Sequence, residues 1–549
     1  MQTVGPLTKP FDVNSAPDRA AAANTIARRA TSASIATMAS RILGVVREMV
    51  LASLFGPSNA MDAYRIAFRI PNMLRDLFAE GVMSAAFVPI FTRRLTLEGK
   101  PSALRLGLVA TNALATITAT FVLIGIVFAE PLVRQLVSAD YAAIPHQIDL
   151  TVFLSRIMMP YLTFIAVAAT AMGMLNALHH FFLPAFSPAM FNVVSIACTL
   201  LLVPVMPALG LPEVTAIAIG TVVGGFAQWA MQLPLLRREG LRYRAVLDWH
   251  DADLRRIVLM MGPGTIGLAA TQINLLVASY LASSETGVVS TLEWAFRVMY
   301  LPIGLFGVSI AAATLPAVSR QHAEQDLPGV RATVADGLSL MLMLNIPATV
   351  GLIVLATPIV RVMYEHGRFT ARDTIATAAA LQLYAIGLVG YSIVRIVSPV
   401  FYAIGANRTP VVIGIITVLM NALLSVALVR GTPLEYRGLP LATSVAALFN
   451  CVALLLLLRR RLHGIGGARL ASTVGRITIA SLAMGAAAFT VDRSLGHALP
   501  DGRLLTEVAR LVMAIAAALG VLAATAFVLR IREFHVAIAS VTGRFPSTD

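Results

Sequence analysis

Arginine side chains interrupt several segments of this sequence that are otherwise apolar and long enough to span a membrane. They are Arg41, Arg47, Arg65, Arg69, Arg75, Arg156, Arg297 and Arg395. A cation at the bilayer centre costs roughly 2.5–3.5 kcal/mol, and arginine cannot escape that cost by losing its proton. We therefore expect these side chains to face a polar cavity and meet anions. Because the planar guanidinium pairs with phosphate oxygens, a phosphate or pyrophosphate suits such a cavity better than a neutral molecule.

Carboxylates in the same segments offer the arginines a second kind of partner. The candidates for pairing are Glu48, Asp76, Glu80 and Glu293. Asp62, Arg65 and Arg69 share one face of a helix, with spacings of three and four residues. Pairing and ligand binding both stay open for Arg65 and Arg69. The predicted substrate-binding residues are Arg41, Arg47, Asp62, Arg69, Arg75 and Arg297.

Two proline sites could bend the helices that carry these arginines. Pro71 lies between Arg69 and Arg75, and the run Gly262-Pro263-Gly264 opens a later apolar segment. Proline removes one helix hydrogen bond and clashes with the preceding turn. We predict a kink at Pro71 and a break with hinge character at residues 262–264.

The composition says which kind of fold must position these residues. Of 549 residues, 58% are hydrophobic and 13% are charged, and the net charge is +14. Soluble domains are about 25% charged, so this composition excludes a soluble enzyme, a disordered chain and an ordinary nucleic-acid binder. A β-barrel would alternate polar and apolar residues. The sequence therefore predicts an all-α, polytopic membrane protein, with its excess of arginine in cytoplasmic loops.

Apolar runs separated by Gly, Pro or charged residues predict about 14 membrane spans. They are 31–55, 62–92, 104–129, 150–177, 183–206, 213–235, 257–282, 289–317, 333–357, 374–404, 409–429, 438–458, 472–491 and 506–529. With the N-terminus inside, 25 loop cations fall on the inner side and 9 on the outer side. This bias places both termini in the cytoplasm.

The sequence also repeats itself. Residues 67–70 (AFRI) resemble residues 295–298 (AFRV), and residues 187–188 (SP) resemble residues 409–410 (TP). The unit is six helices, so the two halves have the same orientation, as in transporters that rock about a central site. The expected parts are a mobile cytoplasmic tail (1–30), an N-lobe (31–240), a C-lobe (250–461), a helix pair with a lipid-tail groove (472–530) and a cytoplasmic tail (531–549).

Other chemical signals are weak. No P-loop, HExxH, GxSxG or dinucleotide motif occurs, which argues against an ATP-driven pump. The adjacent His179 and His180 are not expected to bind a metal, and Cys198 and Cys451 lie in apolar segments where they serve packing. The sequence predicts no metal site, no cofactor and no nucleic-acid partner.

Ten stretches of the sequence resemble the MurJ (MviN) family, over nearly the whole chain beyond the first 30 residues. They are 40–44 (SRILG), 46–48 (VRE), 55–56 (FG), 62–63 (DA), 68–75 (FRIPNMLR), 78–81 (FAEG), 86–89 (AFVP), 261–263 (MGP), 304–316 and 367–370 (GRFT). Members of this family flip lipid II, the undecaprenyl-pyrophosphate-linked peptidoglycan precursor, across the bacterial inner membrane. They belong to the multidrug/oligosaccharidyl-lipid/polysaccharide exporter superfamily.

This resemblance implies a transporter rather than an enzyme, with two six-helix lobes and two further helices. It implies that the essential cavity arginines of the family fall on Arg41, Arg47, Arg75 and Arg297, and the family's aspartate on Asp62. Lipid II and membrane lipids are the expected partners. We expect a monomer that works alongside the cell-wall synthesis machinery.

The sequence departs from the family pattern at two positions. Phe296 stands where many relatives carry an acid, and Ala278 where some carry the aspartate of a sodium site. Sodium coupling is therefore in doubt, and the membrane potential is the expected driving force. The alternatives are export of another polyprenyl-linked glycan or of drugs and, from a different class, an integral-membrane glycan-processing enzyme.

Overall fold

The computed structural model describes residues 16–76, 82–304, 308–498 and 504–534. Within these ranges the chain forms helices joined by turns and loops, and no strand occurs. An apolar segment inside a bilayer must satisfy its backbone hydrogen bonds internally, and only a helix does so within one segment. The prediction of an all-α fold is confirmed.

In chain order, the helices form two series that correspond to each other, followed by a final pair. The first series comprises α1 (Ala16–Phe55), α2 (Asn59–Arg75), α3 (Val82–Glu98), α4 (Lys100–Val127), α5 (Ala129–Leu136), α6 (Ala139–Ala143), α7 (Gln147–Met158), α8 (Tyr161–Ala177), α9 (Phe182–Leu202), α10 (Thr215–Ala230) and α11 (Leu233–Arg238). The second comprises α12 (Ala252–Ala282), α13 (Val288–Pro302), α14 (Val308–Ala323), α15 (Leu327–Val354), α16 (Ala356–Tyr364), α17 (Ala371–Ile386), α18 (Leu388–Ala403), α19 (Arg408–Gly431) and α20 (Gly438–Arg461). The final pair is α21 (Gly467–Ala498) and α22 (Leu504–Val528).

Nine helical stretches of the described residues are long and apolar enough to cross a membrane, and the bent pair α17–α18 makes ten. These ten coincide with ten of the fourteen predicted spans. The other four predictions, 31–55, 62–92, 257–282 and 289–317, fall on α1, on α2 with α3, on α12, and on α13 with α14. Three of these four carry the substrate-binding residues predicted from the sequence.

Two of the predicted spans contain residues that the structure does not describe. Within 62–92 it describes α2 and α3 on either side of residues 77–81, and within 289–317 it describes α13 and α14 on either side of residues 305–307. Proline lies inside each of these four helices, at Pro71, Pro89, Pro302 and Pro316. The expectation of a break at residues 262–264 is wrong in its form, because α12 continues through them as one helix. Any hinge there would be a bend within a helix.

The helix boundaries reproduce the internal repeat. α4 begins at Lys100 and α15 at Leu327, an offset of 327 − 100 = 227. α4 ends at Val127 and α15 at Val354, again 354 − 127 = 227 apart. The same correspondence pairs α5 with α16, α7 and α8 with α17 and α18, and α9 with α19. The duplication therefore extends to the breaks between helices.

The chain packs into two compact units whose boundaries cut through helices. Unit 1 comprises Met1–Arg47, Leu74–Leu123 and Pro160–Gly262, and unit 2 comprises Glu48–Met73, Ile124–Met159 and Pro263–Asp549. Two segments of the first series, 48–73 and 124–159, thus pack in unit 2. One boundary falls at Gly262–Pro263 and another two residues after Pro71.

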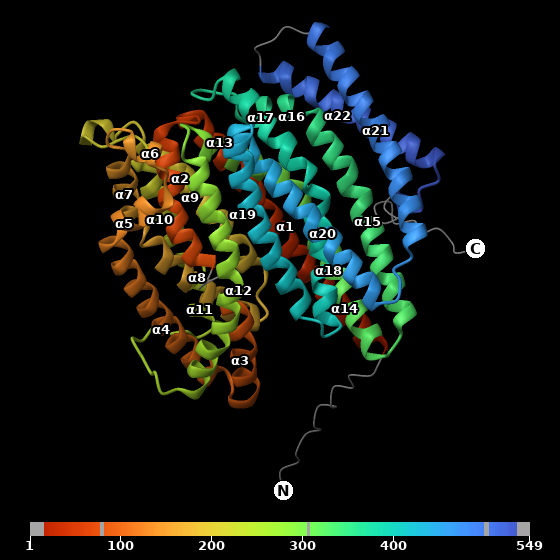
Figure 1. Cartoon of the computed structure of the whole chain (residues 1–549). Coiled ribbons are helices and arrows are strands. Elements are labelled where there is room, and N and C mark those ends of the chain that lie inside the picture. Colours follow the sequence, from red (N-terminus) through yellow and green to blue (C-terminus); the bar gives the residue numbers. More distant parts are fainter. Residues whose placement is uncertain (1–15, 77–81, 305–307, 499–503, 535–549) are drawn as a thin grey trace. The chain divides into compact units, whose positions relative to one another are not determined.

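The core of unit 2 joins the final helix pair to the second series. α21 packs along α22 and α15, and α18 packs against α20 and α15 (Figure 1). Small residues such as Ala480, Ala488, Ala514 and Ala518 are buried in this core. Small side chains let helix backbones approach closely, which drives association where lipid removes the usual hydrophobic advantage.

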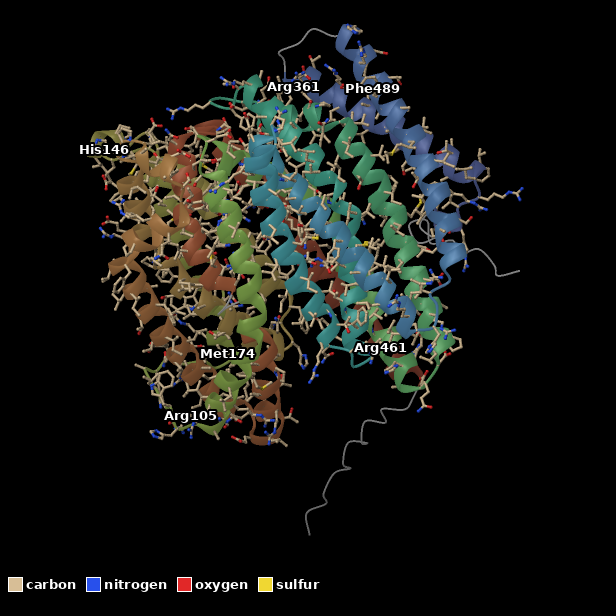
Figure 2. The ribbon with its side chains drawn as sticks, viewed as in Figure 1. Arg105, His146, Met174, Arg361, Arg461 and Phe489 are labelled. Atoms are coloured by element: carbon tan, nitrogen blue, oxygen red, sulfur yellow. The ribbon has the colours of Figure 1, made fainter. Side chains whose placement is uncertain are left out.

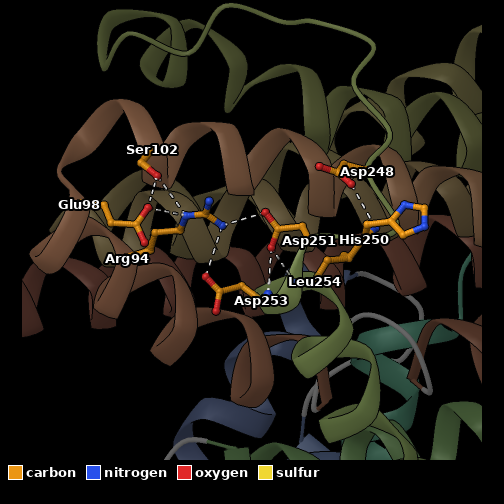
Figure 3. Close-up of polar contacts among 8 residues, drawn as sticks. All are labelled: Arg94, Glu98, Ser102, Asp248, His250, Asp251, Asp253 and Leu254. Atoms are coloured by element: carbon orange, nitrogen blue, oxygen red, sulfur yellow. Dashed lines mark hydrogen bonds and ion pairs between the residues drawn. The ribbon is translucent and has the colours of Figure 1, made fainter.

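In unit 1, a loop between α11 and α12 is tied to α3 and α4 (Figure 3). The Arg94 guanidinium donates to Glu98 and Ser102 on one side, at 3.1 and 3.0 Å, and to Asp251 and Asp253 on the other, at 2.9 and 3.3 Å. We call residues 239–253, held in this way, the linker strap.

Two further contacts hold the linker strap. The Asn112 amide donates to the backbone carbonyls of Arg244 and Val246 at 3.0 and 2.9 Å. Glu239 binds both Lys100 and His180. Hydrogen bonds and ion pairs therefore hold the linker strap at both of its ends and in its middle.

Candidate functional site

Ion pairs in unit 2 connect α1, α2 and α13. Glu48, whose side chain is fully buried, binds Arg65 and also lies 3.4 Å from the Arg297 guanidinium. Glu293 binds Arg65 at 2.9 Å and Arg69 at 3.2 Å. The order is Arg297, Glu48, Arg65, Glu293, Arg69, with three guanidinium groups and two carboxylates. We call these five residues the arginine–glutamate chain.

Each helix supplies its members at helical spacing. Arg65 and Arg69 are four residues apart on α2, and Glu293 and Arg297 are four apart on α13, so each pair shares one helix face. The Arg65 guanidinium is 4% exposed and also lies over the Trp294 ring, 5.6 Å from its centroid. The Arg297 side chain is 41% exposed, which makes it the most accessible member of the chain.

Asp62 holds the start of α13. One carboxylate oxygen accepts the backbone N–H of Gly287 at 2.6 Å, and the other accepts the backbone N–H and the hydroxyl of Ser290, at 2.9 and 2.6 Å. A helix N-terminus carries unpaired N–H groups and a partial positive charge, so a buried carboxylate is stabilised there. Asp62 therefore acts as an N-terminal cap supplied by another helix.

Backbone segments cross closely beside this cap. Gly287 has φ +78°, and a Cβ added to it would lie 2.7 Å from the carbonyl oxygen of Pro57. Gly56 has φ +54°, and its Cβ would lie 2.6 Å from the carbonyl oxygen of Arg368. The N–H of Arg368 donates to the carbonyl of Ser53 at 2.8 Å. Only glycine fits these positions, so the backbone at Gly287 and Gly56 lies in direct contact with the segments that carry Pro57 and Arg368.

The arginine–glutamate chain and the cap join equivalent positions of the sequence repeat. Arg65 binds Glu293, and 293 − 65 = 228. Asp62 binds Ser290, and 290 − 62 = 228. The alignment of residues 67–70 with residues 295–298 has the same offset of 228. Equivalent residues of α2 and α13 therefore contact each other, as residues on a two-fold axis do.

The remaining predicted site residues occupy other surroundings. Arg47 is 8% exposed, and its guanidinium lies over the Phe191 ring at 5.2 Å within unit 1. Arg75 binds Asp76 at 2.9 Å. Arg41 is half-buried on α1. Glu80 lies outside the described residues. Arg69, Arg75 and Arg297, predicted as substrate-binding residues, thus have acidic partners in this structure.

The structure adds residues that the sequence did not single out. Gly287 and Ser290 complete the cap, and Arg65, left open between two roles, is the centre of the arginine–glutamate chain. Phe296, at the first departure from the family pattern, packs on Tyr300, Tyr384 and Tyr391 with ring centroids 5.3–6.3 Å apart. The four-residue spacing in the sequence predicts which residues share a helix face. It does not identify their partners, because these lie more than 200 residues away along the chain.

Two asparagines bind each other one helix turn from the second departure. Asn274, one turn before Ala278 on α12, accepts a hydrogen bond from the Asn421 amide of α19 at 3.0 Å. The Ser425 hydroxyl donates to Asn421 at 3.5 Å. Among the residues that the structure describes, no group of three or more His, Cys, Asp or Glu side chains is placed to hold a metal ion.

A family model described as "Lipid II flippase MurJ" matches residues 51–500. A probable lipid II flippase MurJ of Vibrio cholerae is 35% identical over 435 residues, which are 78% of this chain and 81% of the relative. A lipid II flippase MurJ of Burkholderia cenocepacia is 35% identical over 436 residues, 77% of this chain and 82% of the relative.

Solved structures of other transporters have the same fold as this chain. A lipid II flippase MurJ in an inward closed conformation has a TM-score of 0.72 and 27% identity, covering 90% of this chain and 99% of that chain. An inward-facing multidrug transporter of the MATE family has a TM-score of 0.67 at 16% identity, covering 77% and 94%, which shows a shared fold. The family match covers most of the sequence, and the chain belongs to the MurJ family of lipid II flippases, multi-pass transporters of the inner membrane.

Proposed function

We propose that this protein moves lipid II from the inner to the outer leaflet by alternating access, with its arginines binding the pyrophosphate. The observation that carries the proposal is the arginine–glutamate chain, in which three guanidinium groups share two carboxylates. The chain holds one more positive charge than negative charge before any ligand arrives. A diphosphate would supply the missing anion.

A pyrophosphate that binds these arginines would have to replace the glutamates that pair with them. Removing one partner from a buried ion pair costs about 3–5 kcal/mol, so the arginines must exchange one anion for another and never stand alone. Arg297 is the most exposed member and is bound to Glu48 at 3.4 Å, a longer contact than either of those made by Glu293. We propose that Arg297 leaves its glutamate first and meets the pyrophosphate.

The contacts around the Asp62 cap are candidates for a gate that closes one side of the protein during the transport cycle. Opening this end requires that Gly287 and Ser290 lose their carboxylate acceptor and that the backbone contacts near Gly56 separate. We propose that these contacts form the outer gate in the state described here. Pro71 and residues 262–264 are then the bending points, and the polyprenyl tail stays in lipid beside α21 and α22.

A substitution series tests the pyrophosphate clamp. Arg297→Ala should lower the rate at which lipid II reaches the outer leaflet by at least about tenfold, because a hydrogen bond to a charged group contributes about 1.5–3 kcal/mol. Arg297→Lys should retain part of the rate, since charge remains while the planar fork is lost. The measurement is lipid II accessible on the outer face of proteoliposomes, at matched protein abundance.

Arg134→Ala is the matched control, because Arg134 is exposed and pairs only with Glu130 one turn away. It should leave the flipping rate unchanged. If Arg297→Ala flips lipid II at the normal rate, the arginines do not bind the cargo.

We place both termini in the cytoplasm and propose a working monomer beside the cell-wall synthesis machinery.

A further inference from the structure

A basic pocket lies between the start of α21 and the end of α22, and it shares no residue with the arginine–glutamate chain. Its volume is about 210 Å³, and it is lined by Ser472, Thr473, Arg476, Arg530, Ile531, Arg532 and Glu533. Three arginines and one glutamate leave the lining with a net positive charge of two. Two hydroxyl groups on the α21 side add neutral donors. Guanidinium and hydroxyl groups together are the donors that bind phosphate oxygens.

The local fold builds this pocket from two helix ends. Ser472 and Arg476 lie four residues apart in the first turns of α21, which packs along α22. At the end of α22 the N–H of Ile531 donates to the carbonyl of Ala526 and the N–H of Arg530 to that of Phe527, at 3.0 and 3.1 Å. This is a Schellman motif, which turns the chain back toward α21.

The backbone that carries Arg530 and Arg532 is fixed, while the side chains of all three pocket arginines are exposed. Arg530 occupies the left-handed position of the motif with φ 49°, where glycine is the usual residue. Ile531 is 2% exposed and belongs to the core of unit 2, so the segment cannot swing away from the pocket. Arg476 donates to the carbonyl of Leu529 at 3.4 Å. That bond uses one of the five guanidinium N–H groups and directs the side chain across the pocket.

The pocket lies at the end of unit 2 that carries the Arg459–Arg461 run. Arg461 ends α20, and α21 begins six residues later (467 − 461 = 6). Figure 2 shows Arg461 at one end of the helices of unit 2 and Arg361 and Phe489 at the other. The charge bias of the sequence assigns the Arg461 end to the cytoplasmic face, where anionic headgroups attract basic residues.

We propose that this pocket binds the phosphate group of a membrane lipid at the cytoplasmic face. Its volume is below the roughly 300–1,000 Å³ of sites that enclose a drug-sized ligand, so it has room for a headgroup phosphate but does not enclose a disaccharide-peptide. Acyl or polyprenyl chains would extend into the surrounding bilayer. The test of this site measures lipid binding and not transport, so its failure can be told apart from a failure of the proposed flipping cycle.

The test is lipid binding by the purified full-length protein, measured by native mass spectrometry during titration with dioctanoyl phosphatidylglycerol. The double variant Arg476→Gln/Arg532→Gln should bind at least about tenfold more weakly, because it removes two of the three cations that line the pocket. Arg460→Gln/Arg461→Gln is the matched control. It removes the same charge from exposed residues at the same end that do not line the pocket, and it should bind normally.

Further arms identify the ligand. Undecaprenyl phosphate that competes for the same site supports a lipid phosphate of either kind, whereas phosphatidylcholine should compete weakly. Inorganic phosphate that competes as well as the lipids would overturn the proposal, because the site would then bind a soluble anion. Equal losses in the pocket and control variants would also overturn it. Ser472→Trp, which fills the pocket without changing its charge, should weaken binding while the thermal unfolding temperature stays unchanged.

Discussion

At the scale of single residues, the site consists of charges that neutralise each other between helices. The sequence predicted which arginines lie in membrane segments and which carboxylates are available to them. It did not predict the partners, because the spacing of Asp62, Arg65 and Arg69 describes one helix face only. In the structure the partners of Arg65 lie on α1 and α13, at Glu48 and Glu293. The ligand roles of Arg41, Arg47, Arg69, Arg75 and Arg297 stay predictions.

The Asp62 cap predicts a measurable change in accessibility. Asp62→Ala removes the acceptor of three buried donors, each of which costs about 1–3 kcal/mol when left unsatisfied. The closed end should therefore open more often. A cysteine at Ser53, in a chain with Cys198 and Cys451 replaced by Ala, should react at least about tenfold faster with an impermeant maleimide.

The control for this experiment is Asp149→Ala, because the Asp149 side chain is 84% exposed and lies 3.9 Å from His146 in a surface contact. It should leave the labelling rate of the cysteine at position 53 unchanged. Unchanged labelling in Asp62→Ala as well would mean that the cap does not keep this end closed.

At the scale of helices, the strongest sequence signal was periodic and local. Long apolar runs predicted the position of ten spans, since the bilayer fixes how many residues a helix needs. The same reasoning joined α7 to α8 and α17 to α18, because hydropathy does not detect a helix end inside an apolar run. The repeat offered a better signal, since these two breaks fall at corresponding positions of the two series.

The linker strap predicts a response to acid. The hydrogen bond from Lys100 holds the pKa of Glu239 below its ordinary value of 4.5, and His180 adds to this effect. Burial raises the pKa of Asp251, but bonds from Arg94 and from backbone N–H groups outweigh it and hold the pKa below 3.8. A carboxylate whose pKa is lower in the folded state than in the unfolded state stabilises the fold at pH values above its unfolded-state pKa. This stability is lost as the pH falls through the folded-state pKa.

We therefore expect the strap to be fastened at neutral pH and to loosen below about pH 4. A spin label at position 245, between the two carbonyls that Asn112 binds, should gain mobility as the pH is lowered from 7 to 3. Glu239→Gln/Asp251→Asn should be mobile already at pH 7. A label whose mobility is the same at both pH values would show that these carboxylates do not fasten the loop.

At the scale of the whole molecule, we propose that the cargo's charge couples transport to the membrane potential. Moving two negative charges fully outward gains at most about 4.6 kcal/mol per 100 mV when the inside is negative. The amides of Asn274 and Asn421 bind each other at 3.0 Å, close to the position where some relatives carry an aspartate. Neutral amide oxygens attract a sodium ion less strongly than a carboxylate does, so we expect weaker sodium binding here than at a site with an aspartate.

We therefore predict that flipping in proteoliposomes rises with an inside-negative potential imposed by a potassium gradient and valinomycin. The rate should be the same when sodium is replaced by choline on both sides. Dissipating the potential with equal potassium on both sides is the control. A rate that needs a sodium gradient and ignores the potential would contradict this prediction.

The contact of equivalent positions in α2 and α13 has a consequence for how such a molecule can arise. Two identical polypeptides that meet on a symmetry axis place the same side chain opposite itself, and two arginines in that position would repel each other. Fusion of the two copies into a single gene product removes this restriction. One copy can then carry arginine at position 65 while its counterpart carries glutamate at position 293, and self-repulsion becomes attraction.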